Sequence, residues 1–242
     1  MSANPKLRGS KQHLLTLISD PNYVAAMNRL LSGFATVTSD ECRVPAGCDA
    51  PGECGLPHFL AAHCATWFDT QHVQNWWLPQ QSTGRPPKGV TWDLLSTCTV
   101  SQRRGLLLVE AKAHKSESWS RPSAQSKVNH SHIVRVLQEV NRGLRAVVGD
   151  SVNITIDSHY QLANRLAWTW KLAECGLPVV LLYLGFIGDT HFRDCFRHDD
   201  HWQGVMKVHL EGSVPLDLPG RTITVGSTGS FVLLVKSMPV EA

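Results

Sequence analysis

The chain has 242 residues, of which 43% are hydrophobic and 18% are charged. This composition is too apolar for a disordered chain, and the length is sufficient for one substantial core, so we expect a single elaborated domain over residues 1–242. The formal charge of +3 does not suggest a strongly basic nucleic-acid-binding domain, but it leaves a nucleic-acid partner open.

Sequence features that report on compartment favour the cytoplasm. The amino-terminal segment lacks the apolar core of a signal peptide, and no stretch of about 18 apolar residues predicts a membrane span. Seven cysteines are an odd number, in a chain much longer than small disulfide-framed domains. We therefore expect a cytoplasmic protein with reduced thiols and no membrane partner.

The first third of the chain predicts helices and a loop. Helical spacing predicts a short helix at 10–19 and another through 22–34, started by Asp20 and Pro21. Glycines and prolines predict an irregular loop over 38–55, and a helix-period mixture predicts one longer helix over 56–78.

The loop and the following helix contain a set of possible zinc ligands: Cys42, Cys48, Cys54, Cys64, His58 and His63. Their spacing includes no Cys-x2-Cys knuckle, the strong signature of structural zinc. We expect buried thiols or loop residues here, with a zinc-stabilised interaction module as an alternative that this spacing leaves open.

The middle of the chain predicts a strand hairpin followed by helices. Strand-like runs at 90–100 and 105–114 flank the polar sequence Ser-Gln-Arg-Arg and predict an antiparallel pair. We then expect an exposed loop at 115–130 and two helices, at 133–148 and 159–175, with Ser158 as the cap of the second.

The last part of the chain predicts strands. The apolar run 178–187 is typical of a strand covered on both faces. Further strands are expected at 205–210, 222–225 and 230–235, whereas 192–202 is interpreted as a polar loop. The order of elements predicts an α/β layered domain.

Three charged residues are predicted to meet on the hairpin. Glu110 and Lys112 are two residues apart and so share a face of their strand. A turn at 101–104 would pair position 93 near position 112 and bring Asp93 beside them. Two carboxylates suit Mg²⁺, which takes one or two of them and keeps waters and substrate phosphate, while a lysine beside the ion would assist the attacking water.

Asp93, sixteen intervening residues and Glu110-Ala111-Lys112 on an apolar strand resemble the PD-(D/E)XK nuclease superfamily. The resemblance implies a restriction-endonuclease-like fold, a three-layer core with a mixed central sheet flanked by helices. The core would span about 53–187, with a helical extension at 1–52 and a β-rich extension carrying extra strands at 188–242.

The resemblance also implies a function, a Mg²⁺-dependent DNA nuclease that leaves a 5′-phosphate, with Mn²⁺ able to replace Mg²⁺. The metal would be held by Asp93, Glu110 and the backbone carbonyl of Ala111, with Lys112 assisting the water. Trp92 stands where the family's nominal proline would be. A homodimer would suit cleavage of both strands, but endonuclease and exonuclease action both stay open.

Further site residues are expected on the flanking elements. A family glutamate before the strands would correspond to Glu53, with Asp69 as second choice. Gln161, Arg165 and Trp168 share a helical face, with Gln161 expected in the catalytic set and Arg165 expected to contact nucleic acid. Lys115, Arg121 and Lys127 in the 115–130 loop are expected to contact the DNA backbone.

Two simpler interpretations stand beside the nuclease. Glu110 and Lys112 could form an exposed ion pair at a strand end, which needs no function. The same fold could also serve as a non-catalytic nucleic-acid-binding protein or as a subunit of a larger complex. The apolar run before Glu110 favours a covered strand, and the intact Asp–Glu–Lys set favours the enzyme.

Overall fold

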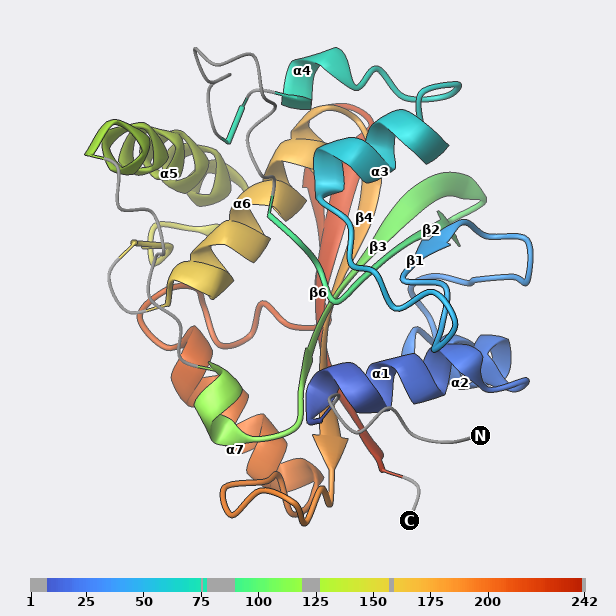
Figure 1. The fold of residues 1–242 in the computed structure, drawn as a ribbon. Helices are drawn as coiled ribbons and strands as arrows, with labels where there is room; N and C mark the ends of the chain where they lie inside the picture. Colours follow the sequence, from blue (N-terminus) through green and yellow to red (C-terminus); the bar gives the residue numbers. More distant parts are fainter. Residues whose placement is uncertain (1–7, 75, 78–89, 119–126, 157–158, 241–242) are drawn as a thin grey trace.

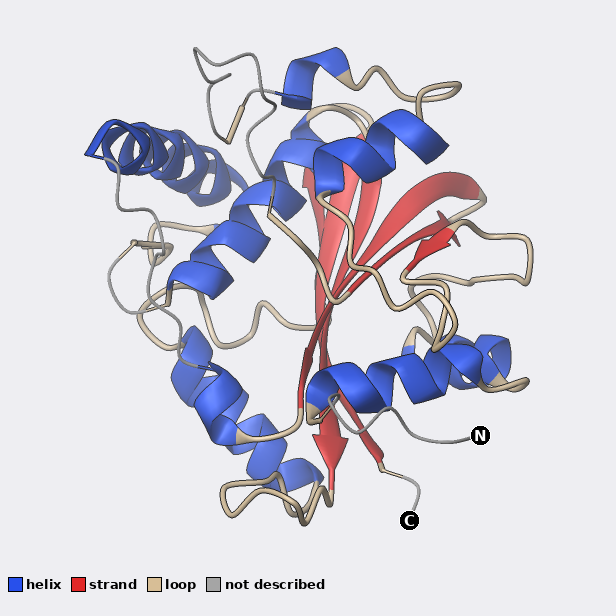
Figure 2. Cartoon of the chain, in the orientation of Figure 1, coloured by secondary structure: helices blue, strands red, loops and turns tan. Residues whose placement is uncertain are grey.

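The protein folds around one mixed β-sheet with helices on both faces (Figures 1 and 2). The computed structural model describes residues 8–74, 76–77, 90–118, 127–156 and 159–240. In these residues the sheet has six strands in the order β1-β2-β3-β4-β6-β5. The α/β class expected from the order of elements is confirmed.

The central strands are parallel and the outer ones antiparallel. β3 pairs with β4 and β4 with β6 in parallel, whereas β1–β2, β2–β3 and β5–β6 are antiparallel. The strands are β1 (Arg43–Val44), β2 (Leu94–Val100), β3 (Arg103–Lys112), β4 (Pro178–Ile187), β5 (Thr222–Val225) and β6 (Gly229–Pro239).

Two helical layers cover the sheet, because side chains alternate between its faces. The helices are α1 (Ser10–Ser19), α2 (Tyr23–Leu30), α3 (Leu56–His63), α4 (Gln71–Gln74), α5 (Lys127–Val148), α6 (Tyr160–Glu174) and α7 (Asp199–Leu210), with a 3₁₀ turn η1 (Lys115–Ser118). Val109 of β3 packs with α1 and α2, whereas Leu108 faces the opposite core, which α3, α5, α6 and α7 share. No described helix is long and apolar enough to span a membrane.

The predicted hairpin is confirmed, and its register differs from the expected one by two residues. Ser101 and Gln102 have positive φ values of 46° and 66°, as a two-residue hairpin turn requires. Leu94 pairs with Val109, so position 93 lies opposite Glu110 and not opposite Lys112. A shift of two residues keeps every side chain on the same face, so the expected convergence survives.

The single helix expected at 56–78 is wrong. α3 ends at His63 and α4 begins at Gln71, where the Asp69 side chain accepts a hydrogen bond from the Gln71 backbone N–H at 3.0 Å. An aspartate that caps backbone N–H groups favours a new helix start over continuation of the old helix.

The strand expected at 205–210 is also wrong, because these residues form the end of α7. The His198 side chain caps the helix, Asp199 and Asp200 lie in its first turn, and Lys207 and His209 lie in its last turn. These charges complement the helix dipole, and the buried positions 202, 206, 209 and 210 follow helical spacing. The polar loop expected at 192–202 therefore ends before α7.

Most of the other predicted elements are present, but α2 ends at Leu30 where a helix to 34 was expected, β1 lies within the loop expected at 38–55, and β2 begins at Leu94 where a strand from 90 was expected. Helix α1 and strands β4 and β5 have the expected bounds, and α5 ends before Gly149, which has a φ of 129°. The segment expected as a helical extension supplies the layer that covers one face, and β6 lies inside the sheet beside β4. Ser158, the expected cap of α6, lies outside the described residues.

Glycine at position 185 allows α7 to approach β4. A Cβ built on Gly185 would lie 2.5 Å from the Trp202 ring. We therefore expect Gly185→Ala to lower the free energy of unfolding by about 1–3 kcal/mol, because the added methyl group overpacks this contact. Gly204→Ala is the matched control, because nothing lies within 4 Å of its Cβ and alanine favours helix by about 0.5–1 kcal/mol. Urea unfolding measures both; equal stability of the two variants would contradict this packing.

Candidate active site

The candidate site forms where β2 stops pairing and β3 continues. The last β2–β3 pair joins Leu94 and Val109, whereas β3 stays paired with β4 as far as Lys112. The Asp93 side chain takes the place of the missing strand, since its Oδ2 accepts a hydrogen bond from the Ala111 N–H at 2.7 Å. The N–H and C=O of one residue point to the same side of a strand, so the Ala111 carbonyl also faces this open edge.

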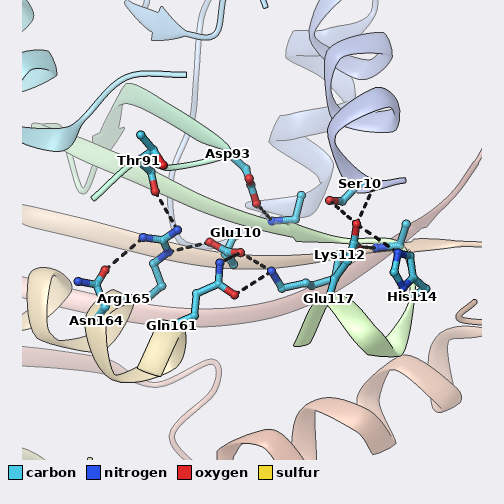
Figure 3. A network of polar contacts seen from close by, with 12 residues as sticks. Ser10, Thr91, Asp93, Glu110, Lys112, His114, Glu117, Gln161, Asn164 and Arg165 are labelled. Atoms are coloured by element: carbon cyan, nitrogen blue, oxygen red, sulfur yellow. Dashed lines mark hydrogen bonds and ion pairs between the residues drawn. The ribbon is translucent and has the colours of Figure 1, made fainter. Parts of the chain in front are cut away.

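Glu110 lies at the centre of a buried network (Figure 3). Its Oε1 accepts hydrogen bonds from Lys112 Nζ and from Gln161 Nε2, the second at 2.6 Å. Its Oε2 accepts one from Arg165 Nε at 2.7 Å. Lys112 Nζ also donates to Gln161 Oε1 at 3.0 Å, so Glu110, Lys112 and Gln161 form a closed triangle of contacts.

Arg165 is held from every side. Besides Glu110, its guanidinium donates to the Thr91 backbone carbonyl at 2.9 Å and to Asn164 Oδ1 at 3.2 Å, and it stacks on the Trp92 ring at 4.1 Å. The residue is only 4% exposed. The guanidinium is therefore enclosed by the protein and bonded within the network, and the expected contact of Arg165 with nucleic acid stays a prediction.

The carboxyl groups of Glu110 and Asp93 have pKa values that are shifted in opposite directions. Burial opposes the charge of Glu110, but the Arg165 and Lys112 cations outweigh it and hold the pKa of Glu110 below its ordinary value. Burial first, and then the negative charge of Glu110, raise the pKa of Asp93 from 3.8 to about 7. The site therefore holds one permanent carboxylate and one carboxyl that loses its proton near neutral pH.

A second carboxylate caps the same edge of β3. Glu117 Oε2 accepts a hydrogen bond from the Ala113 N–H at 2.6 Å, and its Oε1 accepts one from the Ser10 hydroxyl at 3.1 Å. His114 lies 3.5 Å from Glu117 and stacks on Phe192 with ring centroids 4.0 Å apart. These contacts join the end of β3 to α1.

Glu53 and Asp69 were the two candidates for the glutamate that precedes the strands in the family. Of these two, Glu53 lies near Asp93. Glu53 and Asp93 line one small surface recess with Lys11, and Lys11 Nζ forms an ion pair with Glu53 at 2.7 Å. Asp69 lies beside Arg103 and Arg104, near the hairpin turn at the opposite end of β3. The structure therefore separates Asp69 from the cluster and leaves Glu53 at its margin, held by a lysine.

The expected DNA-contacting loop is described only in part. Lys115 is exposed on η1, where its backbone N–H donates to the Asp194 carbonyl at 3.1 Å. Lys127 is the first residue of α5, so the segment expected as a loop to 130 becomes helical there. Arg121 lies outside the described residues.

Sequence reasoning missed the residues that support this network. Trp92 was noted only as a replacement for a proline, yet its ring stacks on Arg165. Tyr183 of β4 pairs with Glu110 in register and is buried, and burial together with the Glu110 charge raises its pKa well above the ordinary value. Its position opposite Glu110 follows from strand pairing, which no local sequence signal reveals.

His209 was also missed, because its segment was interpreted as a strand. It is buried on α7, and its ring lies 4.7 Å from that of His159 at the start of α6. Burial, with further contributions from the charges of His159 and Lys112, lowers the pKa of His209 to about 3. His209 is therefore neutral at pH 7 beside the positive charge of Lys112.

The oxygen donors near the open edge are of the chemical kind that binds a hard divalent cation, and both oxygens of Glu110 already accept hydrogen bonds within the protein. Asp93, Glu110 and the Ala111 carbonyl supply two carboxylates and a backbone oxygen, the donor set that Mg²⁺ accepts. A cation would also relieve the repulsion that raises the pKa of Asp93. Over the described part of the chain, no three His, Cys, Asp or Glu side chains gather closely enough to hold a metal by themselves.

The cysteines expected in reduced form are free in the structure, and Cys42 and Cys48 are exposed while Cys64 is buried.

Comparisons with known proteins do not identify a family: no protein-family model, curated protein or solved structure matches this chain.

The raised pKa of Asp93 predicts a pH-dependent stability. Between about pH 4 and 7 the folded state binds more protons than the unfolded state, so the free energy of unfolding falls as pH rises through this window. Asp93→Asn keeps an acceptor for the Ala111 N–H and removes this penalty. We expect it to be more stable than wild type above pH 7 by about 2–4 kcal/mol and equal to wild type near pH 4.

Urea unfolding of both proteins from pH 4 to 8.5 tests this prediction. The lowered pKa of Glu110 acts in the opposite direction, with stability lost below about pH 4.5, and it affects both proteins equally. A constant difference between the two curves would contradict the raised pKa of Asp93.

Loss of the Glu110 charge should be costly because two buried cations depend on it. We expect Glu110→Gln to lower the free energy of unfolding by about 3–5 kcal/mol, as when one member of a buried ion pair is removed. Glu139→Gln is the control, because the Glu139 pair with Lys171 is partly exposed and should contribute less than about 1 kcal/mol. Equal losses in chemical denaturation would show that the Glu110 network is not a buried charge cluster.

Proposed function

We propose that the protein is a Mg²⁺-dependent nuclease that hydrolyses phosphodiester bonds in DNA, with a restriction-endonuclease-like core of the PD-(D/E)XK type. The observation that carries the proposal is the convergence of Asp93, the Ala111 carbonyl and the Glu110–Lys112 pair at the open edge of β3. The antiparallel β1–β2–β3 meander and the crossover through α5 and α6 to parallel β4 support the fold assignment.

The residues at the site support distinct roles in such a reaction. Asp93, Glu110 and the Ala111 carbonyl would hold Mg²⁺, which supplies Lewis-acid polarisation of the scissile phosphate when bound. Lys112 Nζ lies against Glu110 and can orient the attacking water and offset the negative charge that develops in an in-line displacement. Gln161 holds both Glu110 and Lys112 and so sets the angle between them.

The protonation of Asp93 also links the proposed activity to pH. Its carboxyl must lose a proton before it can bind a metal, and its pKa lies at about 7. The apparent affinity for Mg²⁺ should therefore rise with pH through 7 and level off about one pH unit above it.

A non-catalytic nucleic-acid-binding protein is the second candidate, and one observation favours it. Glu110 is fully buried, and both of its oxygens already accept hydrogen bonds from protein donors. An ion pair that is complete within the protein can be purely structural. Asp93, which is partly exposed and has a pKa of about 7, is the feature that favours the nuclease over this alternative.

Degradation of linear and circular DNA by purified protein tests the proposal, with Mg²⁺, Mn²⁺ or EDTA present. We expect cleavage that requires metal, and a loss of at least about 10³-fold in rate for Asp93→Asn, because that variant loses a metal ligand. Asp93→Asn is the sharpest variant, since it should abolish activity while it increases stability at pH 8.

The matched control is Asp150→Asn, which changes an exposed residue after α5. This variant should cleave DNA at the wild-type rate. Cleavage of the circular substrate separates endonuclease from exonuclease action. If wild type and Asp93→Asn both bind DNA and neither cleaves it, the non-catalytic function takes precedence.

A further inference from the structure

The outer face of α5 is basic. Arg135, Arg142 and Arg145 are exposed, and their spacings of seven and three residues place them on one side of the helix. The acidic residue of α5, Glu139, contacts Lys171 of α6 at 3.4 Å and so lies on the side that packs against the protein. With four basic residues and one acidic residue, α5 carries a formal charge of +3, which equals that of the whole chain. The positive charge of the protein is therefore concentrated on this helix.

The arginines of this face are positioned by neutral groups. In the part of the chain that the structure describes, none of the three forms an ion pair with a carboxylate. Arg135 Nη2 donates to His132 Nδ1 at 2.8 Å, so this imidazole carries its proton on Nε2, which donates to the Trp76 carbonyl at 3.0 Å. Arg145 Nε donates to the Val152 carbonyl at 2.8 Å. These contacts hold two of the guanidinium groups without cancelling their charge.

A nucleic-acid backbone is the partner that suits this face. A guanidinium presents paired N–H donors that match phosphate oxygens, and the three exposed cations are all arginines. They span ten residues, or about 15 Å of the helix axis, which corresponds to about four base pairs of a duplex.

An anionic membrane surface suits the same face less well. A helix that lies in a membrane interface inserts an apolar stripe between the lipids. The apolar stripe of α5 is already buried in the core of the protein and comprises Ile133, Val136, Leu137, Val140 and Leu144. The outer face therefore offers charge without the apolar surface that membrane binding would add.

We propose that the outer face of α5 docks the sugar–phosphate backbone of duplex DNA through Arg135, Arg142 and Arg145, independently of base sequence. α5 packs beside α6, the helix that carries Gln161 to the candidate site (Figure 1). The docking face and the site thus belong to one helical layer. The inference rests on the proposed function for its choice of partner and adds the surface that holds the substrate.

Binding of the full-length protein to a fluorescent duplex of arbitrary sequence tests this face, with EDTA present and anisotropy recorded over a range of salt concentrations. We expect the triple variant Arg135→Gln, Arg142→Gln, Arg145→Gln to bind about 10²–10³-fold more weakly than wild type at about 0.1 M salt. The slope of log affinity against log salt concentration should fall by about 3, because each phosphate contact contributes about 0.9. Glutamine favours helix about as well as arginine, so α5 should be retained.

The matched control removes three cations from other elements, by Arg29→Gln on α2, Arg104→Gln at the hairpin end of β3 and Lys236→Gln on β6. It lowers the net charge by the same amount and should keep the wild-type slope. If both triple variants weaken binding equally, or if neither does, the docking face is refuted. Binding of wild type to vesicles of anionic phospholipid, with none to the duplex, would also overturn the inference.

Cleavage assays on the same proteins distinguish this inference from the proposed function. Metal-dependent cleavage by wild type, with unchanged duplex affinity of the α5 variant, would refute the docking face and leave the nuclease intact. Weakened binding of the α5 variant, with no cleavage by wild type, would keep the docking face and support the non-catalytic function. If the triple variant does not fold, Arg142→Gln decides, with an expected loss of affinity of about eightfold.

Discussion

The burial of one negative charge, that of Glu110, constrains much of this structure. A carboxylate removed from water is costly unless hydrogen bonds and opposite charges compensate it, and Glu110 receives both from Lys112, Gln161 and Arg165. These partners come from β3 itself and from α6, so the charge joins the helical layer to the sheet. The second layer of contacts, Trp92 and the Thr91 carbonyl, lies in the segment leading into β2 and holds Arg165 in place.

The same cluster gives different pKa values to Glu110 and Asp93, two carboxyl groups to which the sequence alone gives the same role as metal ligands. Glu110 faces two cations and stays ionised, whereas Asp93 lies at the open edge with a backbone N–H as its partner and a pKa of about 7. Pairs of titratable groups whose environments move their pKa values apart are common in catalytic sites, although structural charge clusters also produce them. Here burial and the Glu110 charge outweigh the Lys112 and Arg165 cations at Asp93, whereas the same two cations contact Glu110 directly.

Local sequence signals predicted the elements well where one signal dominated. The polar Ser-Gln-Arg-Arg between apolar runs predicted the hairpin, and the continuous apolar run predicted β4. The prediction failed where two periodicities overlapped, because Val205–Leu210 alternates like a strand although the charges at both ends of α7 are those of a helix. The helix over 56–78 was overextended because the capping role of Asp69 was not recognised.

By itself the sequence determined the α/β class, the apolar strands and the approach of Asp93 to Glu110 and Lys112, because alternation and a short turn constrain which residues share a face. It also placed Gln161 and Arg165 on one helical face. Only the tertiary structure decided that this face packs on Glu110, that Trp92 supports Arg165, and that Tyr183 and His209 lie beside the cluster. These contacts join residues from 18 to 99 positions away from Glu110 along the chain, and their pairing depends on how helices pack on the sheet, which no local pattern encodes.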